Sequence, residues 1–110
     1  FEDLKAMRTQ VRKVNVSEDI SRYILALIRS TREESRFKLG SSPRGSLALY
    51  KACQAKAFFE DRDFVTPDDV KFLANPVLAH RILLETKTRY SGDTAESILN
   101  EMMNTLAVPA

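Results

Sequence analysis

The sequence predicts an all-α protein, a small helical bundle in which only very short extended pairs interrupt the helices. Apolar residues recur at spacings of three and four in several segments. Helix-start signals, a serine or threonine followed by proline or acidic residues, precede most of these segments. The connections between them are short, and no internal repeat or low-complexity tract is present. These features are typical of a helical bundle packed around a single core.

Composition limits the chain to one globular domain. It has 110 residues, of which 44% are hydrophobic and 29% charged, so residues 1–110 are expected to form a single core. The 17 basic and 15 acidic residues are interspersed, and a net charge of +2 favours neither nucleic acid nor an anionic membrane. No apolar run approaches the roughly 20 residues needed to cross a bilayer. No secretory signal peptide is visible, and the start at Phe1 rather than Met suggests a piece of a longer chain.

Residues 3 to 13 are expected to form the first helix, because Leu4, Met7 and Val11 share one helical face. Residues 14 to 16 look briefly extended. Ser17 then offers a hydroxyl to the free N–H groups of a second helix, with acidic residues in its first turn. The inward positions of this helix are Ile20, Tyr23, Ile24, Leu27, Ile28 and Thr31.

Residues 33 to 41 are polar and are expected to form a loop. Ser42 followed by Pro43 indicates a helix start, with a hydroxyl cap and a proline at the first position. The helix from residue 43 to about 60 has small and large apolar residues on most sides, which predicts a central helix packed by several neighbours. Its apolar lining is expected to be Leu47, Leu49, Cys53, Phe58 and Phe59.

Residues 61 to 110 contain two more predicted helices, five in all. Phe64 and Val65 form a second extended pair, placed beside residues 14 to 16. Thr66 with Asp69 predicts a capped helix start, with Val65 and Val70 at staple positions, and Pro76 is expected to end that helix. Residues 77 to 92 receive no assignment. Asp93 and Glu96 are interpreted as the capping pair of a last helix with Ala95, Ile98, Leu99, Met102 and Leu106 inward, followed by a tail at 108–110.

The segment with the clearest chemical character is Gly40-Ser41-Ser42-Pro43-Arg44. Arg44 would occupy the second helical position, where a cation is unfavourable by roughly 0.3–1 kcal/mol at an exposed site. Free N–H groups beside a guanidinium suit a docked anion. The alternative is a solvated arginine whose side chain bends away from the helix start. Spacing alone leaves both readings open.

The motifs resemble the C-terminal lid of AAA+ ATPases of the MoxR family. The family's lid has a Gly-x-Ser-Pro-Arg segment opening a helix, matched here from Gly40 to Arg44. Residues 62 to 70, RDFVTPDDV, resemble its "RDYVTPEDV" stretch, and residues 77 to 81, VLAHR, resemble its "VLRHR" stretch. Tyr23-Ile24 through Thr31-Arg32 and the ending Val108-Pro109 also fit. Gly45 departs from the family, which more often has alanine there, at some cost in helix propensity.

This resemblance implies a role in a larger machine. Mg-ATP would lie between a preceding core domain and this lid, with Arg44 as the sensor-2 arginine at the γ-phosphate and Gly40, Ser41, Ser42 and Pro43 shaping the site. Lid motion would become ring motion through neighbouring subunits of a homo-oligomeric ring, a hexamer. Such ATPases act like chaperones, commonly with partners bearing von Willebrand factor A domains. A cytoplasmic location is expected, and the lone Cys53 fits a reducing compartment.

Other candidate sites are interpreted as structural. Gly40-x4-Gly45-Ser46 echoes a phosphate-binding loop, but the lysine is missing and no apolar strand precedes it, so this chain alone is not expected to hydrolyse ATP. His80 is expected to pack or to hydrogen-bond, with Arg81 facing the core domain. Cys53 is expected to be a buried inert thiol, and no metal cluster is proposed. Met102 and Met103 are taken as helix fillers.

The arginines at 22, 29, 32 and 36 could form one basic stripe. Flanking acidic residues favour a solvated, ion-paired helix face over a nucleic-acid surface, and Arg32 could instead contact the core domain or the nucleotide. Two other functions stay open: a stand-alone helical DNA-binding domain, which predicts salt-sensitive duplex binding, and a protein-interaction bundle, in which Arg44 would be dispensable.

Overall fold

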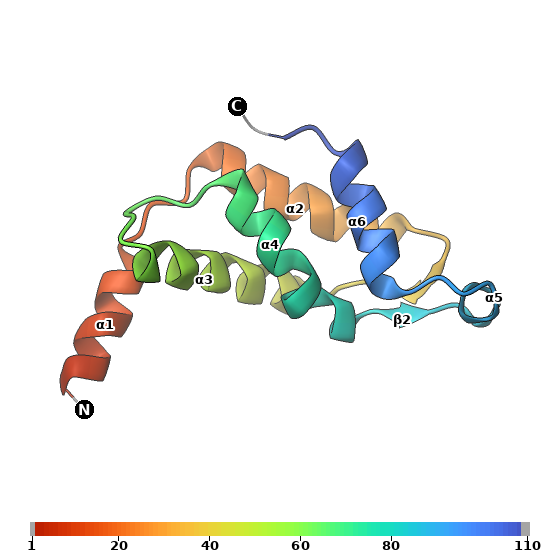
Figure 1. The fold of residues 1–110 in the computed structure, drawn as a ribbon, viewed down its shortest axis with the longest axis horizontal. Helices are drawn as coiled ribbons and strands as arrows, with labels where there is room; N and C mark the ends of the chain where they lie inside the picture. The colour runs from red at the N-terminus through yellow and green to blue at the C-terminus, as the bar shows by residue number, and fades with distance from the viewer. Residues whose placement is uncertain (1, 109–110) are drawn as a thin grey trace.

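The computed structural model describes residues 2–108 and the side chains of residues 5–108, and it confirms the all-α fold class. Within this range there are six α-helices and one 3-10 turn, with one two-stranded sheet at the edge (Figure 1). The elements are α1 (Glu2–Arg12), α2 (Glu18–Glu33), β1 (Phe37–Leu39), α3 (Pro43–Phe59), α4 (Pro67–Leu78), η1 (Ala79–Arg81), β2 (Leu83–Leu84), α5 (Thr86–Tyr90) and α6 (Ala95–Thr105).

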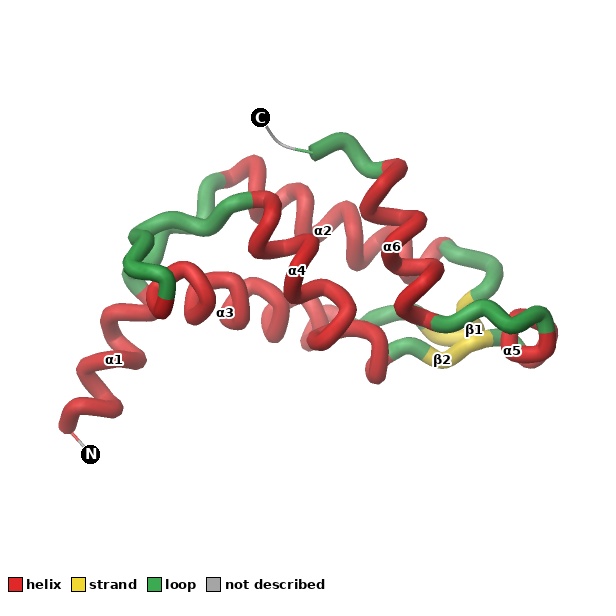
Figure 2. The backbone as a smooth tube through the Cα atoms, in the orientation of Figure 1, coloured by secondary structure: helices red, strands yellow, loops and turns green. Residues whose placement is uncertain are grey.

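The first helix projects from one end of the molecule, opposite the end that carries the sheet and α5 (Figure 2). It begins and ends one residue before the predicted bounds, and the side chain of Leu4 and residues 109–110 of the tail lie outside the described residues. The extended pairs lie side by side, as predicted. Asn15 forms an isolated parallel bridge with Phe64, in which Val65 N–H donates to the Asn15 carbonyl at 3.0 Å.

The core is built around α3, which packs against α1, α2 and α4. Leu49, Cys53 and Ala57 of this helix are completely buried, so the prediction of a central helix is confirmed. Leu47 and Phe59 depart from it, because they are exposed. The inward face predicted for α2 is buried at every position, and the Ser17 hydroxyl caps that helix by accepting from the Ile20 N–H at 3.2 Å.

The prediction of a loop over residues 33 to 41 is confirmed for residues 34–36 and 40–41 and is wrong for the rest. Glu33 still belongs to α2, and β1 pairs with β2 in an antiparallel sheet that joins Phe37 to Leu84. The strand has no local signal, because its partner lies more than forty residues further along the chain. The unassigned stretch from 77 to 92 supplies the end of α4, η1, β2 and α5. The described chain therefore has six α-helices where five were predicted.

Two predicted helix boundaries in the C-terminal half are also wrong. Pro76 does not end α4, which continues to Leu78, because the buried side chains of Ala74 and Leu78 hold this turn against the core despite the missing proline N–H. The capping box of α6 uses Thr94 with Ser97 rather than Asp93 with Glu96. With Asp93 as the N-cap the helix would begin at residue 94, whereas α6 begins at Ala95. Its inward residues are buried as predicted, although Leu106 is only half-buried.

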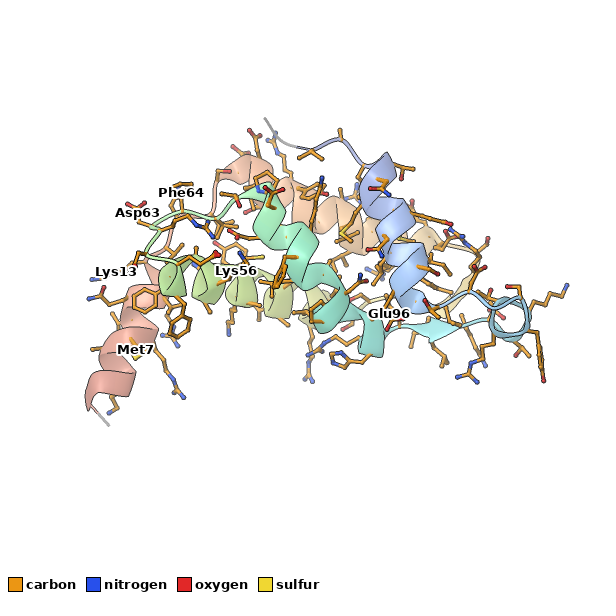
Figure 3. The ribbon with its side chains drawn as sticks, viewed as in Figure 1. Met7, Lys13, Lys56, Asp63, Phe64 and Glu96 are labelled. Carbon is orange, nitrogen blue, oxygen red and sulfur yellow. The ribbon has the colours of Figure 1, made fainter. Side chains whose placement is uncertain are left out.

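A charged network fastens the C-terminal end of α3 to the start of α4. The Asp69 carboxylate is 1% exposed and accepts from the Arg62 guanidinium at 2.8 Å and from Lys56 Nζ at 2.9 Å. It also accepts from the Thr66 N–H at 2.8 Å, which closes the predicted capping box. Glu60 bridges the two cations from the exposed side. Figure 3 shows Lys56 on the part of α3 that lies beside α4.

The electrostatic balance at Asp69 favours the ionised carboxylate. Burial raises the pKa of Asp69, but the hydrogen bonds from Arg62, from the Thr66 N–H and from Lys56 outweigh this effect and hold the pKa below its usual value. A carboxyl whose folded pKa is depressed contributes stability above its unfolded pKa of about 4, and this contribution is lost as the pH falls toward the folded pKa.

We therefore expect the free energy of unfolding to fall as the pH is lowered from about 5 to about 2, in proportion to the protons taken up on unfolding. Asp69→Asn should cost about 3 kcal/mol at pH 7, because it leaves two cations without their buried partner, and it should flatten the acid decline. Urea unfolding across this pH range measures both. Glu60→Gln, at the exposed edge of the same network, should cost clearly less. An unchanged acid slope in Asp69→Asn would contradict this assignment.

Candidate functional site

The candidate site is the connection between β1 and α3, which is pinned to the end of α2. The Ser41 N–H donates to Thr31 Oγ1 at 3.0 Å, and that hydroxyl donates in turn to the Ile28 carbonyl at 2.6 Å. A Cβ at Gly40 would lie 2.4 Å from the Thr31 carbonyl oxygen and 2.8 Å from the Arg32 Cα. Only glycine allows the two backbones to approach this closely. The loop therefore holds a fixed position against α2.

Ser41 and Gly45 pack against each other inside the first turn of α3. Ser41 is 1% exposed, and its hydroxyl donates to the Ser42 carbonyl at 3.2 Å. A Cβ at Gly45 would lie 1.9 Å from Ser41 Oγ and 3.2 Å from Leu78 Cδ2. The sequence interpretation of Gly45 as a simple loss of helix propensity is therefore incomplete, because the missing Cβ makes room for the Ser41 hydroxyl.

The N-terminus of α3 lacks the side-chain cap that the sequence predicted. Ser42 has the extended backbone of an N-cap residue, but its hydroxyl forms no capping hydrogen bond. Pro43 occupies the first helical position as expected, and the Gly45 N–H donates back to the Ser42 carbonyl at 2.8 Å. By contrast, α2, α4 and α6 are each capped by a hydroxyl. The partial positive charge of the α3 start is thus not offset by its own cap or by an acidic residue in its first turn.

Arg44 is exposed at this helix start, as the second residue of α3. Among the described residues no hydrogen bond or salt bridge engages its guanidinium. Two other described arginines near this end, Arg36 and Arg81, are placed differently. Arg36 pairs with Glu34 at 2.6 Å and with Glu101 at 2.7 Å, and Arg81 Nε donates to the Val77 carbonyl at 3.2 Å. Arg44 can therefore extend toward an external anion without breaking an ion pair described here.

Two hollows flank the helix start. One, of about 450 Å³, is lined by residues 37–43 together with Arg32 and Arg81. The other, of about 380 Å³, lies between α2 and α3 and shares Arg32 and Pro43 with the first. Arg44 lines neither hollow. The first brings together three cations, Arg32, Lys38 and Arg81. Lys38 carries no recognisable signal in the sequence, because its position depends on β1 pairing with β2.

The remaining candidates have mixed outcomes. Cys53 is completely buried, and desolvation raises the pKa of its thiol to about 12, so the prediction of an inert thiol is confirmed. Met102 and Met103 are buried fillers, as predicted. His80 is exposed and has no hydrogen bond to a described residue, so its interpretation as a packing or hydrogen-bonding residue is wrong. Within residues 5–108 no group of side chains could hold a metal ion.

The arginines of the possible basic stripe are partly ion-paired. Arg22 bonds to Glu18 at 2.6 Å, and Arg36 bonds to its two glutamates, as expected for a solvated helix face. For Arg29 and Arg32 no salt bridge is found within the described part of the chain. Both line the hollow between α2 and α3. The stripe is thus divided. Arg22 and Arg36 are ion-paired, whereas Arg29 and Arg32, in the last two turns of α2, line a hollow at the candidate site.

A family model described as the AAA lid domain matches residues 29–102. The chain belongs to this family. The match spans α2 to α6 and includes the pinned loop, the uncapped helix start and Arg44. It confirms the resemblance of the sequence motifs to an AAA+ lid.

Several relatives carry MoxR names. The chain is 28% identical over 96 residues to the chaperone MoxR1 of Mycobacterium tuberculosis, covering 79% of this chain and 26% of that protein. It is 41% identical over 46 residues to the protein MoxR of Methylorubrum extorquens, covering 42% of this chain and 13% of that protein. Identity reaches 40% over 108 residues with the uncharacterized protein YeaC of Bacillus subtilis, covering 98% of this chain and 34% of that protein.

A solved structure shows the same fold. The crystal structure of a proposed ATPase from Cytophaga hutchinsonii superposes with a TM-score of 0.86 at 28% identity, covering 93% of this chain and 34% of that chain. The AAA lid chain thus spans about a third of the longer proteins that it matches. None of the helices described here is long and apolar enough to span a bilayer.

The Ser41–Gly45 contact can be tested with a double-mutant cycle. Gly45→Ala should lower the free energy of unfolding by about 2 kcal/mol, because the added Cβ displaces a buried hydroxyl from its hydrogen bond. In a Ser41→Ala background the same change should cost at least about 1 kcal/mol less. Urea unfolding of the four proteins gives the coupling. Equal costs in the two backgrounds would show that the two residues do not compete for this space.

Proposed function

We propose that this AAA lid domain is the nucleotide-sensing lid of a MoxR-type ATPase, with Arg44 as its sensor-2 arginine. In this proposal residues 1–110 form one lid domain, and Mg-ATP is held mainly by an ATPase core elsewhere in the longer protein. Arg44 contacts the γ-phosphate across the cleft between the two domains. Residues 40–43 set the position from which Arg44 reaches it.

The observation that carries the proposal is the unpaired guanidinium at an uncapped helix start. Arg44 is exposed and engages no described residue, and no hydroxyl or acidic residue offsets the positive end of α3. The positive end of a helix and a planar guanidinium together suit a phosphate. Arg32, Lys38 and Arg81 add positive charge at the adjoining hollow. An arginine at this position costs some helix stability, and a nucleotide contact would offset that cost.

The proposed chemistry is electrostatic. During phosphoryl transfer negative charge is spread over the γ-phosphate oxygens, and a fixed guanidinium stabilises it. Release of the cleaved phosphate removes this contact, so the angle between lid and core can change. The loop before α3 is held against α2 by Thr31 and Gly40. A displacement of Arg44 by the phosphate would therefore move the whole bundle, because this loop is not flexible enough to take up the movement.

The relatives' names support the wider setting. A chaperone called MoxR1 is among the similar proteins, so we infer a cytoplasmic machine that helps other proteins to mature. Subunits would assemble into a homo-oligomeric ring, a hexamer, and a protein with a von Willebrand factor A domain would serve as partner. Nucleic acid and membrane are not part of the proposal.

The first test uses Arg44→Ala in the full-length ATPase. We expect turnover of ATP per subunit to fall about 100-fold, because one preorganised donor to the transition state is lost. The stability of the lid should not fall. It should rise by about 0.3–1 kcal/mol, because a cation leaves the positive helix end. Steady-state phosphate release and urea unfolding measure the two effects.

Two further variants separate a sensor from a surface charge. Arg44→Lys keeps the charge but loses the planar fork, so its turnover should lie between those of the wild type and the alanine variant. Arg89→Ala removes an exposed arginine of α5 that lines neither hollow beside the α3 start, and it should leave turnover unchanged. Wild-type turnover in Arg44→Ala, with the ring still assembled in sedimentation runs, would refute the sensor role.

A further inference from the structure

An apolar groove runs between α1 and α3, and Arg44 is not among the residues that line it. It has a volume of about 680 Å³, and its apolar lining includes Met7, Val11, Leu47 and Phe59. Leu47 is 54% exposed and Phe59 is 68% exposed. Figure 3 labels Met7 on α1, in the helix that projects from the end of the bundle. Apolar side chains gathered in a concave surface are typical of a binding site rather than of ordinary surface.

The two helices that form the groove are strongly basic, although the whole chain is nearly neutral. Together α1 and α3 contain six basic residues and only two acidic ones, Glu2 and Asp3 at the start of α1. Arg8, Arg12 and Lys51 line the groove itself. No salt bridge engages these three within the described residues. The groove therefore combines an apolar floor with a positive rim.

We propose that this groove binds an acidic amphipathic helix of a partner protein. Apolar side chains on one face of such a helix, spaced at i, i+3, i+4 and i+7, would enter between α1 and α3. Carboxylates on its flanks would meet Arg8, Arg12 and Lys51, and this charge match would select the partner and speed its association. The site does not involve Arg44, so it adds a second binding surface to the same long helix α3.

The shape of the groove favours a helix over other anionic partners. Duplex nucleic acid is bound mainly through its phosphates, and the four apolar side chains of the groove floor form no favourable interaction with phosphates. A bilayer surface is best met by a protruding apolar face rather than by a hollow. The hollow between two splayed helices instead matches the cross-section of a third helix.

The experiment uses a fluorescein-labelled designed peptide of about 18 residues, with leucine at the four spaced positions and glutamate elsewhere, titrated with the chain by anisotropy. We expect saturable binding that weakens about tenfold in Phe59→Ser, which is equivalent to about 1.4 kcal/mol. Phe72→Ser is the matched control, because Phe72 is also 68% exposed but lies on α4 outside the groove. It should bind like the wild type.

The charge of the rim is tested separately. Lys51→Glu should weaken the glutamate peptide and strengthen a peptide in which lysine replaces every glutamate. Equal binding of the two peptides to the wild type, or equal weakening by Phe59→Ser and Phe72→Ser, would overturn the proposal. So would preferential binding to anionic vesicles or to duplex DNA, or self-association of the chain that Phe59→Ser abolishes in sedimentation, because each assigns the groove to another occupant.

Discussion

The position of α3 depends on a backbone contact that only glycine permits. Gly40 passes so close to the Thr31 carbonyl that a single added carbon would overlap it, and the Thr31 hydroxyl completes the attachment by accepting from the Ser41 N–H. Because the side chains at 40 and 45 are reduced to hydrogen, the chain can turn directly from β1 into α3. The first turn of that helix, with Arg44 on it, is therefore held against α2 by packing as well as by hydrogen bonds.

The other end of α3 is held by charge. Asp69 sits buried at the start of α4 and binds Lys56 and Arg62, which flank the end of α3. A helix of 17 residues is about 25 Å long, and with both ends fastened α3 can act as a stiff element. In our proposals one end of it meets a phosphate and its outer side meets a partner helix. A rigid α3 would link the two surfaces mechanically, because neither end can yield without breaking buried contacts.

The candidate site was predictable in part. The segment from Gly40 to Arg44 is visible in the sequence as a glycine, a hydroxyl, a proline and an out-of-place cation, and the structure brings these residues together at one helix start. The lack of a Ser42 cap was not predictable, because a serine before a helix can turn its hydroxyl elsewhere. The cations Lys38 and Arg81 reach the same hollow through the pairing of β1 with β2, and a non-local pairing leaves no local trace.

The sequence by itself determined five of the six described α-helices and the buried face of α2. It could do so because apolar spacing and the hydroxyl caps of α2 and α4 depend only on residues a few positions apart. Tertiary structure alone decided that β1 pairs with β2 and that α4 continues past Pro76. It also decided that Gly45 lies against the Ser41 hydroxyl and that a basic-rimmed groove forms between α1 and α3. The physical reason is the same in each case. These features depend on contacts between residues far apart in the chain, and the free energy of such contacts exists only once the bundle has closed.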